Sequence, residues 1–321
     1  MAFPFTPWTG SHRMKKKVII DCDVGVDDAL ALILAFHSPE LEIKAITGVN
    51  GNVPLNQVFE NIKKVLSLIQ PEKNPLIARG AAQPLQGHAP YAHSVHGKTG
   101  LGEAEIDPKK GETWWTLFPG PAHELITKIA RQYPNELTLI AVGPLTNLAL
   151  GIQKDLEGMK KLKEVVIMGG TVRTKGNVTP YAEFNIYVDP LAAKIGFESG
   201  LPITLVPLDV THQVFLTPRW MEEQVCPLDT PFSNFVIKAT GYDIKSSCFK
   251  NRGSIFLHDP LAVGLVIEPQ LVKTERLPLQ VEIKEGKYYG KITEVKEGPE
   301  INVCFGVNAE MFLELFVSRL R

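Results

Sequence analysis

The stretch VIIDCDVGVDDALAL, residues 18–32, joins a strand to a helix through a group of closely spaced acidic residues. Its opening apolar run is typical of a strand buried in a parallel sheet, and its closing apolar pattern is typical of a helix. The acids between them are Asp21, Asp23, Asp27 and Asp28. Because like charges this close raise one another's cost of ionisation, the segment is either a solvated turn or a cation site.

Short apolar runs alternate with helical patterns along the rest of the chain. The expected strands are 18–21, 43–49, 137–142, 165–168 and 203–207. The expected helices are 28–37, 57–69, 124–132 and 190–199. This alternation predicts an α/β fold with an open, mostly parallel, twisted sheet flanked by helices, of the Rossmann-like class. Near the C-terminus, LPLQVEIKEGKYYGKITEV predicts a small antiparallel hairpin that turns at residues 285–286.

Bulk composition limits the classes of partner. The chain has 321 residues, of which 44% are hydrophobic and 21% charged, as in ordinary globular proteins. Its net charge of -1 provides no basic field, so neither a nucleic acid nor a membrane surface is an expected partner. Residues 1–16 are expected to be a flexible extension, and residues 17–321 a single domain.

The cysteines and the N-terminus predict a cytoplasmic protein. Cys22, Cys226, Cys248 and Cys304 show no CxxC spacing, which favours reduced thiols over disulfides or a zinc site. The basic MKKKVII is followed by an acid rather than by a signal-peptide cleavage site. No segment reaches the roughly 20 apolar residues that a membrane span requires.

Polar residues gather where several expected strands end. In a parallel sheet with right-handed crossovers, the C-terminal strand ends share one edge, and ligands bind beyond that edge. The aspartates follow the first strand, and Asn50 and Asn52 follow the second. GPLTN and GGTVRTKGNVTPYAEFN follow the strands 137–142 and 165–168. The sequence therefore predicts a ligand site at this edge.

A bound cation explains the aspartates better than the alternatives do. An EF-hand would need Gly and Glu where Val26 and Leu32 stand. Helix capping explains one or two acids but not four. Ca²⁺ accepts crowded carboxylates more readily than Mg²⁺ does. Further along, His258 stands beside Asp259, which pairs a titratable proton donor with a metal-type ligand and predicts a catalytic histidine.

These motifs resemble those of a known family. DCDVGVDDALAL is similar to the Asp-x-Asp-Pro-Gly-x-Asp-Asp-Ala signature of the inosine-uridine preferring nucleoside hydrolases, with Val24 in place of proline. The similarity continues, in the family's order, through AITGVNGN, HGKTGLG, AVGPLTNLA, EVVIMGG, GNVTPYAEFNIYVDP, LDVTHQ and LHDP. It extends over nearly the whole chain from residue 17 onward.

The resemblance implies a Ca²⁺-dependent enzyme that hydrolyses ribonucleosides to ribose and free base. The implied calcium ligands are Asp23, Asp28, Asp259 and the main-chain carbonyl of Val142. The implied ribose contacts are Asp27, Asn52 and Asn185 at the 2′- and 3′-hydroxyls, Asn177 and Glu183 at the 5′-hydroxyl, and Met168 along the pocket. Asp21 would brace the metal loop, and His96 would lie beside the base. A homodimer or homotetramer is also implied.

The resemblance also assigns the proton transfers. Asp23 would accept a proton from a calcium-activated water, and His258 would protonate the departing base. Cleavage of an N-glycosidic bond builds positive charge on the sugar, which carboxylates around the ribose stabilise. The segment before LHDP departs from the family pattern. It leaves Tyr242, Phe249 and Arg252 as ambiguous base contacts and the preferred base open.

Two other functions remain as alternatives. A haloacid-dehalogenase-like phosphatase also begins with a strand that ends in Asp-x-Asp, but its lysine and its late acidic pair are not found in the required places. A nucleoside-binding protein without activity would keep the ribose contacts and lose the residues that move protons, whereas Asp23 and His258 are both present. Release of reducing sugar from inosine, uridine or cytidine separates these alternatives.

Overall fold

The computed structural model describes residues 14–102, 104–106, 112–245 and 254–321, with the backbone alone for 242–245. In this part of the chain one ten-stranded sheet has the order β11-β10-β12-β7-β6-β5-β1-β2-β3-β4. Its strands are β1 (Lys16–Cys22), β2 (Leu41–Gly48), β3 (Leu76–Arg79), β4 (Thr116–Leu117), β5 (Leu137–Ala141), β6 (Glu164–Met168), β7 (Ile203–Val206), β10 (Val272–Val281), β11 (Ile292–Glu294) and β12 (Glu300–Val307). The strands β8 (Phe215–Leu216) and β9 (Ile255–Phe256) form a separate antiparallel pair.

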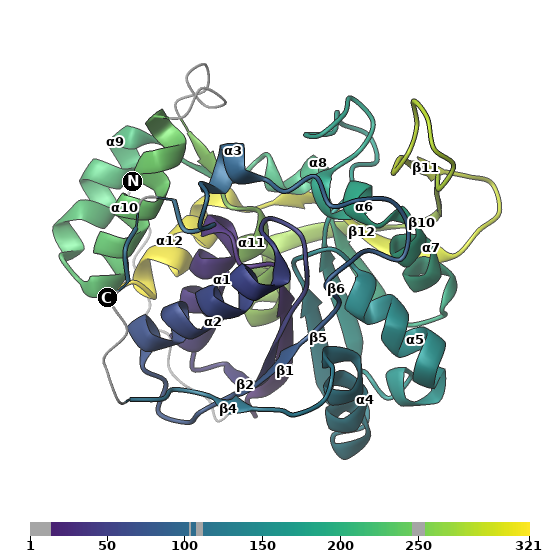
Figure 1. Cartoon of the computed structure of the whole chain (residues 1–321). Helices are drawn as coiled ribbons and strands as arrows, with labels where there is room; N and C mark the ends of the chain where they lie inside the picture. Colours follow the sequence, from purple (N-terminus) through teal and green to yellow (C-terminus); the bar gives the residue numbers. More distant parts are fainter. Residues whose placement is uncertain (1–13, 103, 107–111, 246–253) are drawn as a thin grey trace.

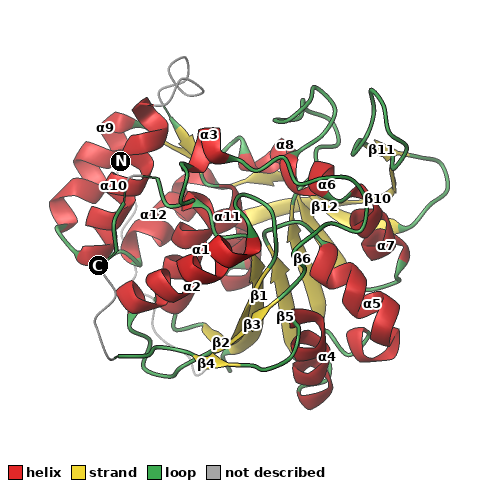
Figure 2. Ribbon diagram, viewed as in Figure 1, coloured by secondary structure: helices red, strands yellow, loops and turns green. Residues whose placement is uncertain are grey.

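Helices cover both faces of the large sheet (Figures 1 and 2). The α-helices are α1 (Val26–Phe36), α2 (Leu55–Ile69), α3 (His93–His96), α4 (Ala122–Gln132), α5 (Thr146–Met159), α6 (Phe184–Val188), α7 (Pro190–Glu198), α8 (Leu208–Thr211), α9 (Pro218–Trp220), α10 (Pro231–Lys245), α11 (His258–Ile267) and α12 (Ala309–Ser318). Short π and 3₁₀ turns are η1 (Met221–Val225), η2 (Cys226–Leu228) and η3 (Pro269–Leu271).

The alternating side chains of β1 connect two hydrophobic cores. Val18 and Ile20 belong to the core under α1, α2, α11 and α12, whereas Ile19 belongs to the core under α4, α5 and α7. Successive side chains of a strand point to opposite faces, so a strand buried on both faces needs an unbroken apolar run. This requirement explains why residues 18–20 carry no polar side chain.

The expected parallel sheet is confirmed. Each of the five expected strands and four expected helices is present, with its ends within two residues of the predicted ends. The parallel pairs are β1 with β2 and β5, β5 with β6, and β6 with β7. Their C-terminal ends therefore lie at the same edge of the sheet.

The C-terminal hairpin is present but is less separate than expected. β10 pairs antiparallel with β11, and residues 282–291 connect them, which is a longer connection than the expected turn at 285–286. β10 also pairs antiparallel with β12, and β12 pairs parallel with β7. The hairpin therefore extends the edge of the large sheet. The sequence analysis missed this because β12 supplies the link and was not predicted.

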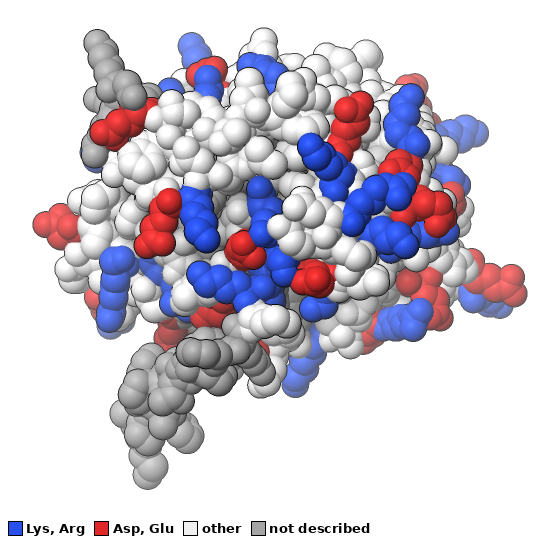
Figure 3. Space-filling view, turned by 90° about the horizontal axis from the view of Figure 1, so that it is seen from below, with Lys and Arg blue, Asp and Glu red and all other residues white. Residues whose placement is uncertain are grey.

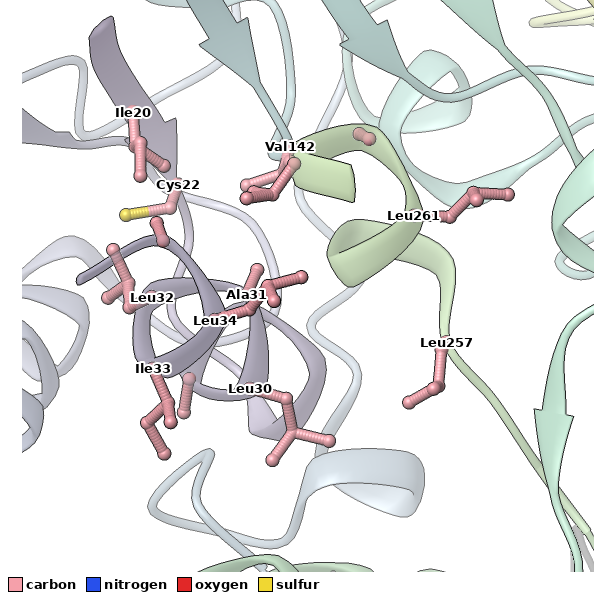
Figure 4. Close-up of a cluster of buried hydrophobic side chains, with 14 of the residues drawn as sticks. Ile20, Cys22, Leu30, Ala31, Leu32, Ile33, Leu34, Val142, Leu257 and Leu261 are labelled. Carbon is pink, nitrogen blue, oxygen red and sulfur yellow. The ribbon is translucent and has the colours of Figure 1, made fainter. Parts of the chain in front are cut away.

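The helices α1 and α11 pack against each other beside the end of β5. Leu30 on α1, Leu261 on α11 and Val142 after β5 are buried in one core, which Figure 4 shows in close-up. This packing places the N-terminal turns of the two helices side by side. Both turns are acidic, with Asp27 and Asp28 on α1 and Asp259 on α11.

The surface shows no large field of one sign on the face in Figure 3. Lys and Arg side chains are interspersed there with Asp and Glu. Among the described residues, no helix is both long enough and apolar enough to cross a lipid bilayer.

Candidate active site

A pocket of about 940 Å³ opens beyond the C-terminal ends of the parallel strands. The predicted site residues that line it are Asp27, Asn52, His96, Val142, Met168, Asn177, Glu183, Asn185, His258 and Asp259. They come from seven of the motif blocks and from both halves of the chain. The fold thus gathers residues whose proximity the sequence could only suggest.

Two aspartates after β1 are buried beneath this lining. Asp23 and Asp28 are fully buried. The backbone N–H of Asn52 donates to Asp23 Oδ2 at 2.6 Å, and the Asn52 side-chain amide donates to Asp28 Oδ2 at 3.2 Å. Asp28 also accepts the backbone N–H groups of Asp23 and Gly25, at 3.1 and 2.8 Å. Asn52 therefore links the second strand end to both acids.

Asp21 holds neighbouring strand ends together. Its Oδ1 accepts a hydrogen bond of 2.5 Å from the Thr47 hydroxyl and one of 2.8 Å from the Asn147 amide. Burial raises the pKa of Asp21 to about 7. The sequence analysis missed Thr47 and Asn147, although both lie inside quoted motifs, AITGVNGN and AVGPLTNLA. These contacts join Asp21 to neighbouring strand ends, and its expected role of bracing a metal loop stays a prediction.

Asp27 and Asp259 connect the two helix N-termini. The backbone N–H of Asp259 donates to Asp27 Oδ2 at 2.9 Å, so the first turn of α1 caps the first turn of α11. Burial and the charges of Asp27, Asp28 and Asp23 raise the pKa of Asp259 well above its usual range. We call Asp23, Asp27, Asp28 and Asp259 the acidic floor of the pocket.

The acidic floor has the donor chemistry of a site for a hard cation. Asp23 Oδ1 is buried and accepts no hydrogen bond from the described residues. Burial and Asp28 raise the pKa of Asp23 well above its usual range, a repulsion that a cation would relieve. The described residues contain no ready-formed cluster of three His, Cys, Asp or Glu ligands. The available donors are nevertheless all oxygens, as Ca²⁺ and Mg²⁺ require.

Asn185 stands between two strand ends on the side of the expected sugar contacts. Its amide donates to the carbonyls of Val142 and Met168, at 2.8 and 3.1 Å. The Val142 carbonyl, the expected metal ligand, thus already accepts one hydrogen bond. A carbonyl oxygen has a second lone pair, which can still bind a cation.

Glu183 and Asn177 shape the chain around α6. Glu183 caps α6 and accepts the backbone N–H groups of Gly170 and Asn185, at 2.7 and 2.9 Å. Burial raises its pKa. Asn177 Oδ1 accepts the backbone N–H of Phe184 at 2.9 Å. Both predicted 5′-hydroxyl contacts therefore also hold their own loop in place.

A group of imidazole and phenyl rings also lines the pocket. His258 Nδ1 lies 2.7 Å from the Thr211 hydroxyl. The His258 ring centroid is 5.7 Å from that of His212 and 5.6 Å from that of Phe256. Burial, together with His212 and His96, lowers the pKa of His258 to about 3, so its imidazole is neutral near pH 7.

His96 lies on α3 and lines the same pocket. The backbone N–H of Val26 donates to its Nδ1 at 3.1 Å, and burial lowers its pKa to about 4. A neutral His96 that accepts at Nδ1 carries its proton on Nε2. The ring is therefore fixed as a hydrogen-bond donor at Nε2.

Sequence reasoning missed several residues of the pocket wall. The missed residues are Phe184, Thr211, His212 and Phe256. Each lies within or beside a quoted motif. Its position near a motif, rather than its residue type, could therefore have identified it. Of the ambiguous candidates, Phe249 and Arg252 lie outside the described residues, as does the side chain of Tyr242.

Comparisons with known proteins place this geometry in a class. A family model described as inosine-uridine preferring nucleoside hydrolase matches residues 18–314. The pyrimidine-specific ribonucleoside hydrolase RihA of Salmonella gallinarum is 36% identical over 316 residues, which cover 96% of this chain and 99% of that protein.

Solved structures show the same likeness. A purine-preferring ribonucleoside hydrolase from Gardnerella vaginalis superposes with a TM-score of 0.87 at 32% identity, and a plant nucleoside hydrolase does so with 0.87 at 30%. Each comparison covers 95% of this chain and 98% of the other. The fold and site define an enzyme that hydrolyses N-glycosidic bonds of ribonucleosides. The chain belongs to the inosine-uridine preferring nucleoside hydrolase family.

Proposed function

We propose that this chain hydrolyses ribonucleosides by a calcium-dependent mechanism in which Asp23 is the base and His258 the leaving-group acid. The observation that carries the proposal is that carboxylates, an amide and two histidines line one pocket. The lining includes Asp27, Asp259, Asn185, His96 and His258, and Asp23 and Asp28 are buried beside Asn52. N-glycosidic cleavage needs both: negative charge near the sugar and a proton donor near the base.

The calcium ligands in this proposal are Asp23, Asp28, Asp259 and the Val142 carbonyl. Their all-oxygen chemistry, and the repulsion that raises the pKa values of Asp23 and Asp259, support a divalent cation among them. Closely spaced carboxylates suit the adaptable coordination of Ca²⁺ better than the octahedron that Mg²⁺ demands. When bound, calcium supplies a positive charge that anchors the ribose diol and lowers the pKa of water.

The ribose is held by polar residues around this site. Asp27, Asn52 and Asn185 bind the 2′- and 3′-hydroxyls in the proposal, with Met168 along the sugar. Asn177 and Glu183 bind the 5′-hydroxyl. As the bond to the base breaks, the carboxylates of the acidic floor stabilise the positive charge that develops on the sugar.

The two proton transfers in the proposal use two different residues. Asp23 Oδ1 accepts no hydrogen bond from the described residues, which leaves it available to accept a proton from the attacking water. Thr211 occupies His258 Nδ1, which leaves Nε2 for the base. Burial lowers the pKa of His258 to about 3, so the ring is neutral near pH 7, and in the proposal its Nε2–H is the group that donates to the departing base.

A panel of ribonucleosides tests the proposal and assigns the base. Purified protein is incubated with calcium and uridine, cytidine, inosine or guanosine, and released ribose is measured as reducing sugar. The relatives named above include pyrimidine-specific and purine-preferring enzymes, so both classes belong in the panel. Hydrolysis of at least one member supports the proposal. Tight binding of a ribonucleoside without ribose release would instead indicate a binding protein.

The proposal extends to the organisation of the enzyme. Residues 17–321 act as one domain, in a homodimer or homotetramer, in the cytoplasm. Light scattering on the purified protein measures the oligomer directly. A monomeric mass together with full activity would reject the oligomer.

A further inference from the structure

The connection between β10 and β11, residues 282–291, contacts two segments that carry site residues. One segment is 81–96, which leads into α3 and His96, and we call it the base-side rim. The other is 171–187, which carries Asn177, Glu183 and Asn185, and we call it the sugar-side rim. In Figure 1 the chain before α3 crosses the top of the molecule toward α6 and the β10–β11 region.

The base-side rim depends on contacts from outside itself. Residues 81–92 form no helix or strand. The middle of this stretch is held by the Leu85 backbone N–H, which donates to Asp189 at 2.7 Å, and by the Gln86 amide, which donates to the Ile283 carbonyl at 2.9 Å. An irregular segment without a ladder of its own takes its position from such external partners.

Tyr289 fills the junction between the two rims. A Cβ added at Gly87 would lie 2.5 Å from the Tyr289 hydroxyl, so the base-side rim passes directly against this side chain. The Tyr289 ring also packs edge-on against Tyr187 of the sugar-side rim, with 5.4 Å between ring centroids. Tyr289 therefore contacts both rims at once.

Neighbouring residues hold the connection against the sugar-side rim. A Cβ added at Gly290 would lie 3.1 Å from the Tyr187 Cα and 3.2 Å from the Ala182 Cβ. Gly290 also has a φ of +78°, which a side chain rarely adopts. The Tyr288 ring packs edge-on against Tyr181 at 4.8 Å, with Lys287 and Lys291 near both rings. These contacts bring the backbone of the connection close to that of the sugar-side rim.

We propose that residues 282–291 act as a bracket that sets the width of the substrate pocket, with Tyr289 as its central positioning residue. This inference rests on the proposed function. Without the ring of Tyr289, the two rims sample wider arrangements, and substrate binding must restore the narrow one. Apparent affinity then falls in proportion to the population of the binding-competent arrangement. The acidic floor is built on other elements and keeps its geometry.

The test compares Tyr289→Ala with the wild type in steady-state hydrolysis of the best ribonucleoside. We expect KM to rise about tenfold and kcat to stay within about twofold, because saturating substrate restores the competent arrangement. Tyr289→Phe should behave like the wild type, because it keeps the ring and loses only a hydroxyl contact of 3.5 Å to the Gln86 carbonyl. Gln86→Ala should raise KM by a smaller factor, since it frees one rim only.

Tyr133→Ala is the matched control. Tyr133 is also half-buried, but it contacts Lys44 at the end of the sheet opposite the pocket. Loss of its ring should lower thermal stability and leave KM unchanged. A merely structural Tyr289 would behave in the same way: Tyr289→Ala would lower Tm, and kcat would fall only as folded protein was lost.

Two outcomes separate the inference from the function on which it rests. If the wild type hydrolyses ribonucleosides and Tyr289→Ala keeps the wild-type KM, the bracket is wrong and the function stands. If the wild type releases no ribose from any ribonucleoside, the proposed function fails first. In that case the bracket is rejected if Tyr289→Ala also leaves the Kd for uridine, measured by calorimetry, unchanged.

Discussion

The acidic floor and the two rims are built in different ways. The floor is compact in sequence: three of its four aspartates lie within residues 23–28, and the fourth begins a helix packed beside theirs. The rims are mostly irregular apart from α3 and α6, and both contact residues 282–291. The chemistry therefore resides on elements anchored in the core, whereas the fit to substrate depends on surface contacts between distant segments.

This difference predicts which mutations change kcat and which change KM. Changes in the floor alter groups that meet the reacting atoms, so they should act mainly on kcat. Changes in the rims alter how the substrate is held, so they should act mainly on KM.

The largest effect should come from the substrate rather than from the protein. Removing the ribose 2′-hydroxyl leaves Asp27, Asn185 and the bound cation without a partner, and sites of this kind discriminate by about 10⁴-fold. We expect kcat/KM for 2′-deoxyuridine to be lower than for uridine by about that factor. 5′-Deoxyuridine, which keeps the diol, should lose far less. Similar kcat/KM values for uridine and 2′-deoxyuridine would refute a floor that recognises the diol.

Asp23→Asn should lower kcat by about 10³-fold on natural and artificial substrates alike. The change keeps the shape of the side chain but removes the charge and the proton acceptor. Rates on uridine and on a nitrophenyl riboside measure it. Asp155→Asn is the control, because Asp155 pairs with Arg131 on the surface, away from the pocket, and its loss should leave both rates unchanged. A loss confined to uridine would mean that Asp23 serves the leaving group instead of the water.

His258→Ala should discriminate between leaving groups. A nucleobase leaves poorly as an anion, so loss of its proton donor should lower kcat by about 10²-fold or more. A nitrophenolate needs no proton, so the nitrophenyl riboside should be cleaved at nearly the wild-type rate. His123→Ala on α4 is the matched control. If His258→Ala slows both substrates equally, the histidine is not the leaving-group acid.

Asn177→Ala should give the smallest effect. It tests whether the sugar-side rim contacts the 5′-hydroxyl of the substrate. Loss of one hydrogen bond to the 5′-hydroxyl should raise KM for uridine by about threefold to tenfold. With 5′-deoxyuridine the variant and the wild type should have the same KM, because the partner is already missing. An equal rise in KM on both substrates would show that Asn177 acts only by holding Phe184 and its loop.

The centre of the parallel sheet could be predicted because its five strands β1, β2, β5, β6 and β7 are encoded locally. Residues 18–20 must be apolar on both faces, and the aspartates follow directly, so strand and strand-end site are visible together. Ten of the predicted site residues line one pocket, and most of these were identified by the resemblance to the nucleoside hydrolase family. Contacts between segments distant in sequence could not be predicted in this way. The hydrogen bond from Thr211 to His258 and the packing of Tyr289 against Tyr187 have no local pattern.

The strand order at the edge of the sheet could not be predicted from local sequence patterns either. The hairpin of β10 and β11 was visible as two apolar runs, but its attachment to the sheet depends on β12, which pairs with both β10 and β7. That pairing is set by the tertiary fold rather than by propensity. The functional consequence is direct, because this attachment carries residues 282–291 to the rims.

Calcium titration of metal-stripped protein tests whether the acidic floor binds the metal ion on which hydrolysis depends. Calorimetry and ribose release from uridine are measured on the same samples of wild type and Asp28→Ala. The account predicts one bound Ca²⁺ per wild-type chain, activity restored in proportion to occupancy, and at least about 100-fold weaker binding by Asp28→Ala, because a charged ligand is lost. Full hydrolysis of uridine by metal-free wild type would show that the reaction does not depend on bound calcium.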